Sequence, residues 1–543
     1  MRAASEPEPE SFEQGRASTA RRPDGPDHGN PTGKFRGRRV GVAAAAIALT
    51  LLVGCSLPLL GPSSPRIPSV ATDTAQVEEC GIACTNCFQH LCGSVDLCEN
   101  MYVAPPGGRH PGRNGPLTAV EMQMARIAWK YFENNLQETT GLVNAVNDYP
   151  STTMWDTASY MAGMVAAREL CIIDKHEFDR RMVAILATFN RMEFFRGELP
   201  NKVYNTQTAA KVDYGNQPGE IGFSALDLGR LLIWLRIIKE RYPEHGNAID
   251  RFIMRWNFCN VLDDCGTMYG AAVTDDGQVR YLQEGRLGYE EYAAKGFALW
   301  GFNTRRASLA EPYSTINLFD IHVPFDSRDP RVLGAHNYVV CESYVLDAIE
   351  LNWDEPDDIS SDDKTHTVPW IAEFAQRIYD VQEARYHHTG IITARTEHQL
   401  AEAPYFVYDT IYTDGFGWNT ITEDGRYVPE HAAIALKGAL GLWAVWETPY
   451  TDLLFDTISG LYDEEKGFFE GKYELSGDKI PTYTANNNGI MLESLLYKVQ
   501  GKLLRFSGRV SVWDRTVEDE FQGQLKCFPR HKRGCGPGRT RGR

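Results

Sequence analysis

The chain has 543 residues, of which 43% are hydrophobic, with 12 cysteines and a formal charge of −17. Between residues 55 and 520 it carries 40 basic and 66 acidic side chains, a balance that repels a phosphate backbone and argues against a nucleic-acid partner. Both ends are more basic than this acidic body, which has the composition of a large globular protein.

The N-terminal segment, residues 1–54, predicts a disordered leader that ends in an export signal. Its first part is rich in Pro, Gly, Ser and charge, which is typical of disorder. Basic residues then precede a short run of small apolar residues from Val40 to Val53, an order typical of a secretory signal. Cys55 follows and resembles the cysteine of a bacterial lipoprotein box. This implies a lipid on Cys55 that tethers the protein to a membrane, at the periplasm or cell surface. The alternative is a transmembrane anchor, but the run is shorter than the roughly 20 residues that a bilayer requires.

Export permits disulfides, and residues 55–116 form a cysteine-rich cap followed by a Pro/Gly linker. The spacing of the cap cysteines does not match a tetrahedral metal site, and the sequence does not pair them: Cys80, Cys84, Cys87, Cys92 and Cys98. Cys259 and Cys265 flank a short loop, which predicts a disulfide between them. Cys171 and Cys341 lie in apolar, helix-like stretches and are expected to be buried thiols.

The body, residues 117–504, repeats one unit, an apolar run with helical spacing followed by a loop rich in aromatic and polar residues. The spacing predicts eleven or twelve helices, with runs near 127–132, 161–166, 178–186, 228–235, 247–257, 291–301, 344–351, 371–381, 436–443, 451–459 and 491–499. Small residues within several runs, such as Gly163, indicate close contacts between neighbouring helices.

Strand signals are short and lie between the helical runs. The clearest is a hairpin over Tyr269–Leu282. Because no βαβ pattern or long alternating stretch is present, we expect a mainly α fold of helical pairs with β-hairpin inserts in the loops. The remainder, residues 505–543, is predicted to be a basic, disordered tail.

Five of the loops combine aromatic, amide and charged side chains, a composition that suits a carbohydrate. Aromatic faces stack on the apolar side of a sugar ring, while carboxylates, amides and Arg bind its hydroxyls. Each loop precedes a helical run, so a ring of helical pairs would gather these residues at one mouth. The candidate substrate-binding residues are Trp155, Tyr214, Asn216, Gln217, Glu220, Arg286, Tyr289, Arg395, Asp409, Tyr412, Trp418, Asn419 and Asn487.

Glycoside hydrolysis requires two carboxyl groups across the scissile bond. We assign the general acid to Glu291, with Glu290 as its rival, because the neighbouring tyrosines would bury the carboxyl and raise its pKa. Asp156 is the predicted partner and Glu342 the reserve. Each of these acids also has a structural interpretation, since Asp156 is typical of a helix cap and Glu290 and Glu291 of first-turn acids that complement a helix dipole.

No metal or organic cofactor is predicted. The chain has neither a glycine-rich phosphate loop nor an HExxH motif. The acidic loop at residues 357–363 lacks the glycine and the closing glutamate of a calcium-binding EF-hand. A solvated turn is the better interpretation of that loop.

These motifs, in this order, resemble the DUF3131 family of bacterial exported proteins. The resemblance covers residues 117–502 and is carried by WDTASY (155–160), DYGNQPGEIGFSALDLGR (213–230), YLQEGRLGYEEYAAKGFALWG (281–301), LGAHNYVVCESYVLD (333–347) and TANNNGI (484–490). The family is similar to six-hairpin glycosidases and, more distantly, to glucoamylase-like and β-1,2-glucanase-like enzymes. The resemblance therefore implies an (α/α)6 toroid that acts on a glycan.

The expected function is a membrane-tethered glycoside hydrolase or transglycosylase on a bacterial poly- or oligosaccharide. One alternative keeps the fold without the chemistry, as a glycan-binding or scaffold lipoprotein for polysaccharide synthesis or export. Another is a polysaccharide lyase, in which His336, Asn337 and Tyr338 would serve proton abstraction beside an acidic sugar. The acidic body counts against such a substrate.

Overall fold

The computed structural model describes residues 112–274, 276–330, 335–360, 364–518 and 526–529. The predicted leader, the lipidation site at Cys55 and the cap cysteines lie outside these residues. Within them, the eleven predicted helical runs all fall on helices of the structure.

Six of these helices form an inner ring. They are α4 (Met154–Glu169), α6 (Ala225–Arg241), α8 (Tyr289–Ala298), α10 (Glu342–Leu351), α12 (Leu436–Val445) and α14 (Ala485–Gln500). Each helix contacts the next one in this order, and α14 also contacts α4, so the ring is closed. Nearly every residue of the inner helices is buried, as expected for helices that are surrounded on all sides.

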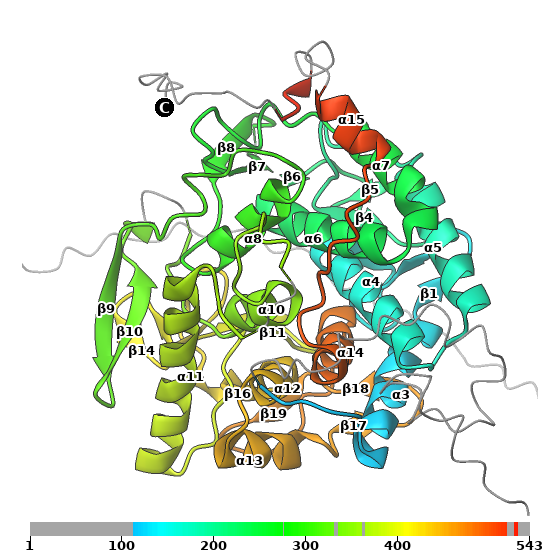
Figure 1. Cartoon of the computed structure of the whole chain (residues 1–543). Coiled ribbons are helices and arrows are strands. Elements are labelled where there is room, and N and C mark those ends of the chain that lie inside the picture. The colour runs from blue at the N-terminus through cyan, green and yellow to red at the C-terminus, as the bar shows by residue number, and fades with distance from the viewer. Residues whose placement is uncertain (1–111, 275, 331–334, 361–363, 519–525, 530–543) are drawn as a thin grey trace, which may run out of the picture. The chain divides into compact units, whose positions relative to one another are not determined.

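Outer helices precede and cover the inner ones. They are α3 (Ala119–Asn134), α5 (Lys175–Phe189), α7 (Gly246–Met254), α11 (Pro369–Thr389) and α13 (Pro449–Ile458). Figure 1 shows α10, α12 and α14 in the middle, with α3, α5, α11 and α13 outside them. Between α8 and α10 the described residues contain the hairpin β9 (Tyr313–Leu318) and β10 (Ile321–Asp326) in place of an outer helix, and β10 packs on α11. This alternation of outer and inner helices confirms the predicted (α/α)6 toroid.

Glycines allow the closest contacts in the ring, as the small residues of the sequence predict. A Cβ atom on Gly296 of α8 would lie 2.0 Å from the carbonyl oxygen of Gly229 on α6. On α14, a Cβ atom on Gly489 would lie 2.4 Å from the carbonyl oxygen of Ser159 on α4. Larger side chains at these positions would force the inner helices apart.

The other strands are short and antiparallel, and they lie in the loops that lead into the inner helices. They are β1 (Leu136–Gln137), β2 (Leu142–Val143), β3 (Ser151–Thr153), β4 (Val203–Asn205), β5 (Lys211–Val212), β6 (Gly222–Phe223), β7 (Tyr269–Val273), β8 (Val279–Gln283), β11 (His398–Gln399), β12 (Phe406–Asp409), β13 (Tyr412–Thr413), β14 (Phe416–Gly417), β15 (Thr420–Ile421), β16 (Ala433–Ala435), β17 (Tyr462–Asp463), β18 (Gly467–Phe468) and β19 (Gly471–Tyr473). Their sheets have two or three strands. The predicted hairpin is β7–β8, in which Tyr269 pairs with Gln283.

The segment after α14 differs from the predicted disordered tail. It contains α15 (Val512–Glu518), which packs on α7, and the indole of Trp513 is buried against Trp300. Cys527 forms a disulfide with Cys259. The described part of this segment therefore packs against the outside of the toroid and belongs to the folded unit.

The predicted Cys259–Cys265 disulfide is wrong. Cys259 bonds to Cys527, 268 residues away, and Cys265 is disulfide-bonded as well, but not to Cys259. Spacing along the sequence cannot identify a partner that the fold brings near from the far end of the chain. Cys341 is a buried free thiol, as predicted. In the described part of the chain, no helix has the length and apolar character needed to cross a membrane.

Candidate active site at the mouth of the toroid

The six inner helices begin at the same end of the ring, because each is preceded by a helix or hairpin that returns the chain to that end. Their first turns and the β-containing loops surround one mouth. First-turn residues of four inner helices meet there, namely Trp155 of α4, Glu342 of α10, Lys437 of α12 and Asn486 of α14. The predicted convergence of the loops at one end is thus present.

The carboxylate of Glu342 is the centre of the floor of this mouth. Its Oε2 lies 2.5 Å from Lys437 Nζ and accepts a hydrogen bond from Thr396 Oγ1 at 3.2 Å. Its Oε1 accepts from Trp155 Nε1 at 3.2 Å and from Asn486 Nδ2 at 3.0 Å. Burial would raise the pKa of Glu342, but the Lys437 ammonium and these donors hold it below its ordinary value. Glu342 is therefore a buried, ionised anchor.

Arg230 of α6 supports this floor from the axis of the ring. Its Nη1 donates to Asn486 Oδ1 at 3.0 Å and to Ser159 Oγ at 2.7 Å, and its Nη2 donates to Glu493 Oε1 at 3.0 Å. The guanidinium carbon lies 4.8 Å from the centre of the Trp155 ring, a cation–π contact. The two residues that donate to Glu342 Oε1 are thus held in place by one buried cation.

Asp227 and Glu284 form a pair of half-buried carboxylates on the α6 side of the mouth. Asp227 lies in the first turn of α6, with Oδ1 3.0 Å from Ser224 Oγ. The Glu284 carboxylate accepts a hydrogen bond from the Ala225 N–H of the same turn. Burial and the charge of Glu284 raise the pKa of Asp227 to about 7, so Asp227 is a carboxyl group that can hold a proton at neutral pH.

Glu397 is half-buried in the loop that leads into α12. Its Oε1 accepts a hydrogen bond from the Tyr289 hydroxyl at 2.6 Å. Burial and the nearby Glu342 charge raise the pKa of Glu397 to about 7, while Lys437 acts in the opposite direction. Glu397 thus lies beside the start of α8 and near the charges of Glu342 on α10 and Lys437 on α12, whereas Asp227 lies at the start of α6.

Asp156, the predicted partner of the general acid, also lies half-buried at this mouth. The Thr153 hydroxyl donates a hydrogen bond to Asp156 Oδ2 at 2.7 Å. The same hydroxyl oxygen accepts a hydrogen bond from the Asp156 N–H. Burial raises its pKa against the opposing charges of Lys437 and Arg230. It is therefore both part of a helix cap and a member of the acidic mouth.

Glu291 and Glu290, the two candidates for the general acid, do not face the mouth. Glu291 is 1% exposed, and its Oε2 accepts the Gly288 N–H at 2.6 Å, which caps α8. Glu290 is 0% exposed and lies 3.0 Å from Arg328 Nη2. Both carboxyl groups have raised pKa values because of burial. Their positions favour the structural interpretation.

Three predicted sugar ligands are buried and bind protein groups instead. Arg286 donates all its hydrogen bonds to backbone carbonyls, including those of Ala335 and His336. Arg395 lies 2.7 Å from Asp409 and is buried with it. Arg395 and Asp409 compensate each other's charge inside the insert before α12, and Arg286 is bound to the backbone, so these groups are not available to a sugar.

Most of the remaining predicted ligands also have protein partners. Two amides donate to backbone carbonyls, Asn487 to that of Phe469 and Asn419 to that of Thr413. Two aromatic rings are covered, that of Tyr412 by Phe325 and that of Trp418 by Arg385. Glu220 forms an ion pair with Lys211. Tyr214, Asn216 and Gln217 lie on the turn before β6, where Tyr214 is 66% exposed and Asn216 binds Asn205. Trp155, Tyr214 and Tyr289 thus remain the best placed of the set.

Sequence reasoning missed Asp227, Glu397, Lys437 and Arg230 as site residues. Asp227 is indistinguishable from a first-turn capping acid, and Arg230 stands inside an apolar helical run. Glu397 is in a short loop whose composition gave no signal. Only the closure of the ring brings these residues together.

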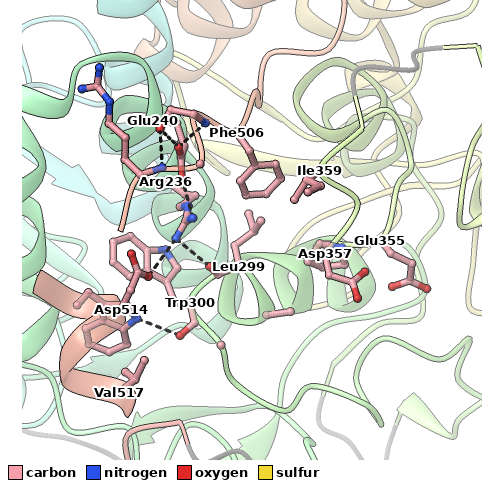
Figure 2. A pocket seen from close by; sticks show the side chains of 17 residues that line it. Arg236, Glu240, Leu299, Trp300, Glu355, Asp357, Ile359, Phe506, Asp514 and Val517 are labelled. Atoms are coloured by element: carbon pink, nitrogen blue, oxygen red, sulfur yellow. Dashed lines mark hydrogen bonds and ion pairs between the residues drawn. The ribbon is translucent and has the colours of Figure 1, made fainter. Parts of the chain in front are cut away.

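A cavity of about 840 Å³ lies elsewhere, beside the ends of α6, α8 and α10, and is lined by Arg236, Trp300, Ile359, Phe506 and Asp514 among others. Figure 2 shows that Arg236 and Glu240 pair with each other there, at 2.7 Å. It lies at the end of the inner helices away from the loops, so it is separate from the acidic mouth.

Comparison with known proteins agrees with the fold. The sequence model of a family described as protein of unknown function (DUF3131) matches residues 123–501. No curated protein matches the chain significantly.

Two solved structures show the likeness in three dimensions. The endo-β-1,2-glucanase of Chitinophaga pinensis, solved with sophorotriose and glucose, has a TM-score of 0.51 at 11% identity, over 71% of this chain and 94% of that one. The endo-β-1,2-glucanase of Talaromyces funiculosus, solved with sophorose, has a TM-score of 0.47 at 12% identity, over 70% of this chain and 84% of that one. At 11% identity, the likeness to the Chitinophaga pinensis structure shows the toroid fold.

Proposed function

The chain belongs to the DUF3131 family, and from this premise we propose that it is an exported, lipid-tethered glycoside hydrolase that cleaves a bacterial poly- or oligosaccharide. The observation that carries the proposal is the pair Asp227 and Glu397. These two half-buried carboxyl groups have pKa values of about 7, and they lie at one mouth, Asp227 at the start of α6 and Glu397 beside the start of α8. The toroid fold, shared with a structure solved with sophorotriose and glucose, supports the same conclusion.

Their surroundings divide the two roles. Asp227 has the negative charges of Glu284 and Asp156 near it, which favour its protonated form. Glu397 accepts a hydrogen bond from Tyr289 and lies near the Lys437 ammonium, which favour its ionised form.

Asp227 would therefore donate its proton to the glycosidic oxygen as the bond from that oxygen to the anomeric carbon breaks. Glu397 would act on the anomeric carbon from the other side, as the base for water or as the nucleophile. The buried Glu342–Lys437 pair holds Trp155 and Asn486 in place below them.

The hydrolase accounts for the mouth better than the lyase does. Asn337, one of the residues that a lyase would use, is buried and donates to the Asp326 carbonyl, while His336 lies 2.6 Å from Asp414. The mouth carries a surplus of carboxylates, and an acidic sugar would be repelled there.

The lipid tether rests on the sequence around Cys55. Expression of the full chain in a bacterial host that is fed a labelled fatty acid should label the protein and recover it with membranes. A Cys55→Ala variant should lose both the label and the membrane association. If the wild-type chain is exported without label, the tether is refuted.

The hydrolysis is tested with linear β-1,2-, β-1,3-, β-1,4- and β-1,6-glucans and product chromatography. We expect one glucan to be cleaved, and Asp227→Asn and Glu397→Gln each to lower kcat by about 10²- to 10⁴-fold. The control is Glu373→Gln on the outer helix α11, where the carboxylate is 59% exposed. Binding without any product would favour the non-catalytic glycan-binding protein, and full activity of both variants would refute the assigned pair.

A further inference from the structure

A row of five aromatic rings leads from the floor of the mouth to its rim. In order, these rings belong to Trp155 on α4, Tyr289 on α8, Tyr338 before α10, and Tyr408 and Phe406 on β12. Successive ring centres lie 5.6, 5.9, 4.8 and 5.1 Å apart. The row is continuous although four separate stretches of the chain supply it.

The row passes directly beside the proposed catalytic groups. Trp155 Nε1 donates to Glu342, and the Tyr289 hydroxyl donates to Glu397. The Trp155 ring is covered on one face by Arg230, is contacted by the rings of Tyr289 and Tyr292 at 5.6 and 6.1 Å, and remains partly exposed. A ligand bound to Trp155 would thus lie next to Glu397.

Four of the five rings are half-exposed and do not belong to the buried core. Tyr289 is buried, whereas Trp155, Tyr338, Tyr408 and Phe406 are half-buried, and Tyr405 next to the outermost ring is 62% exposed. Core aromatics of this protein, such as Trp129 and Trp234, are almost fully buried instead. An aromatic surface that is continuous, half-exposed and adjacent to acids needs a ligand to cover it.

The charges beside the row define what that ligand can be. The carboxylates whose charges act on Tyr338 and Tyr408 are Glu284, Glu397 and Glu423, and the guanidinium of Arg286 is committed to backbone carbonyls. Carboxylates accept hydrogen bonds from sugar hydroxyls, and aromatic faces pack on the apolar faces of the rings. A neutral hexose chain meets both requirements.

We propose that this aromatic row binds consecutive sugar units on one side of the cleaved bond, and that the substrate is therefore a neutral polysaccharide chain and not a disaccharide. The inference rests on the proposed hydrolase function and specifies its substrate. A disaccharide would contact only the innermost exposed ring, Trp155, whereas a longer chain would also cover Tyr338, Tyr408 and Phe406.

The test measures kcat and KM on the glucan that is cleaved fastest, from its disaccharide through longer fractions to the polymer. We expect kcat/KM to rise with chain length. Tyr408→Ala should raise KM for the polymer about tenfold, the equivalent of about 1.4 kcal/mol, without changing kcat or the disaccharide kinetics. Tyr408→Phe should behave as wild type, because stacking uses the ring and not the hydroxyl. Tyr313→Ala, on the outer strand β9, is the control.

Two kinds of result distinguish a failure of the aromatic row from a failure of the proposed hydrolase function. A cleaved glucan with kcat/KM independent of length, or an equal effect of Tyr408→Ala on disaccharide and polymer, overturns the aromatic row alone. If no glucan is cleaved, calorimetric titration of the full chain with the same fractions decides. Affinity that rises with length would then support the row while the hydrolase fails, and no binding would overturn both. The length series of the wild-type protein decides even if Tyr408→Ala does not fold.

Discussion

The ion pair on the floor of the mouth gives the sharpest test of the electrostatics. Lys437→Met removes the cation and keeps a side chain of similar length. Glu342 would then be a buried carboxylate whose partners are three neutral donors, from Trp155, Thr396 and Asn486. Removing one member of a buried pair costs about 3–5 kcal/mol of unfolding free energy. Because these donors remain, we expect a loss near the lower end of that range, about 3 kcal/mol.

The pH dependence of this loss has a definite sign. In the wild-type protein the pKa of Glu342 is lowered, so its ionised form stabilises the fold above the unfolded pKa of about 4.3. That contribution is lost as the pH falls through the folded value. In the Lys437→Met variant, burial raises the pKa of Glu342. The unfolding free energy of this variant is then highest below about pH 4.3, where the carboxyl group is protonated, and it falls as the pH rises. The deficit of Lys437→Met should therefore be larger at pH 7 than at pH 5.

The assay is urea unfolding followed by tryptophan fluorescence, for Lys437→Met, Glu342→Gln and the double variant. Since the double variant removes both charges of the pair, it should be more stable than Lys437→Met alone, a clear non-additivity. The control is the exposed pair Arg377 and Glu373 on α11, where Glu373→Gln should change stability by less than about 1 kcal/mol. A Lys437→Met protein as stable as wild type at pH 7, or an additive double variant, would refute this account of the floor.

Three further changes have defined outcomes. Glu284→Gln removes the charge that helps to raise the pKa of Asp227, so the alkaline limb of the kcat/KM profile should move to lower pH; an unmoved limb contradicts the assignment of Asp227. Cys527→Ser opens a covalent link over 268 residues and should lower the unfolding free energy by about 2–5 kcal/mol, measured in urea without reductant. Gly296→Ala should cost about 1–3 kcal/mol by overpacking the α6–α8 contact, whereas Gly460→Ala, where a Cβ would meet open space, should cost far less.

Local periodicity was sufficient to predict the helical framework. The apolar runs of the inner helices are set by burial on all sides, and the small residues mark close contacts, as Gly163 does where the Phe132 ring packs on α4. The β7–β8 hairpin was predictable because Asp276-Gly277 is a strong turn signal. These features depend on residues that are close together in the sequence.

Features that depend on atypical turns or on distant contacts were not predictable. The β9–β10 hairpin turns at Phe319 and Asp320, both with positive φ, where a turn of this kind normally carries Asn or Gly. The tail up to α15 has the composition of a disordered segment, and only Trp513 packed against Trp300 and Phe258 shows that it folds. Both depend on tertiary contacts that override local preference.

The first turns of the inner helices explain why the acids of the site could not be assigned from sequence. Asp227 and Glu291 occupy the same place, the third residue of α6 and of α8. At α6 the capping residue is Ser224, whose hydroxyl satisfies the helix N–H of Asp227 itself, so the carboxylate stays half-buried and faces the mouth. At α8 the capping residue is Gly288, which has no side chain, and the Glu291 carboxylate bends back to accept the Gly288 N–H. At α6 the carboxylate is therefore not the cap, and at α8 it is the cap. A hydroxyl cap does not by itself free the acid, because at α3 Glu121 accepts the Thr118 N–H although the Thr118 hydroxyl accepts the Glu121 N–H. At α4 the arrangement is that of α6: the Thr153 hydroxyl accepts the Asp156 N–H, and Asp156 stays half-buried at the mouth.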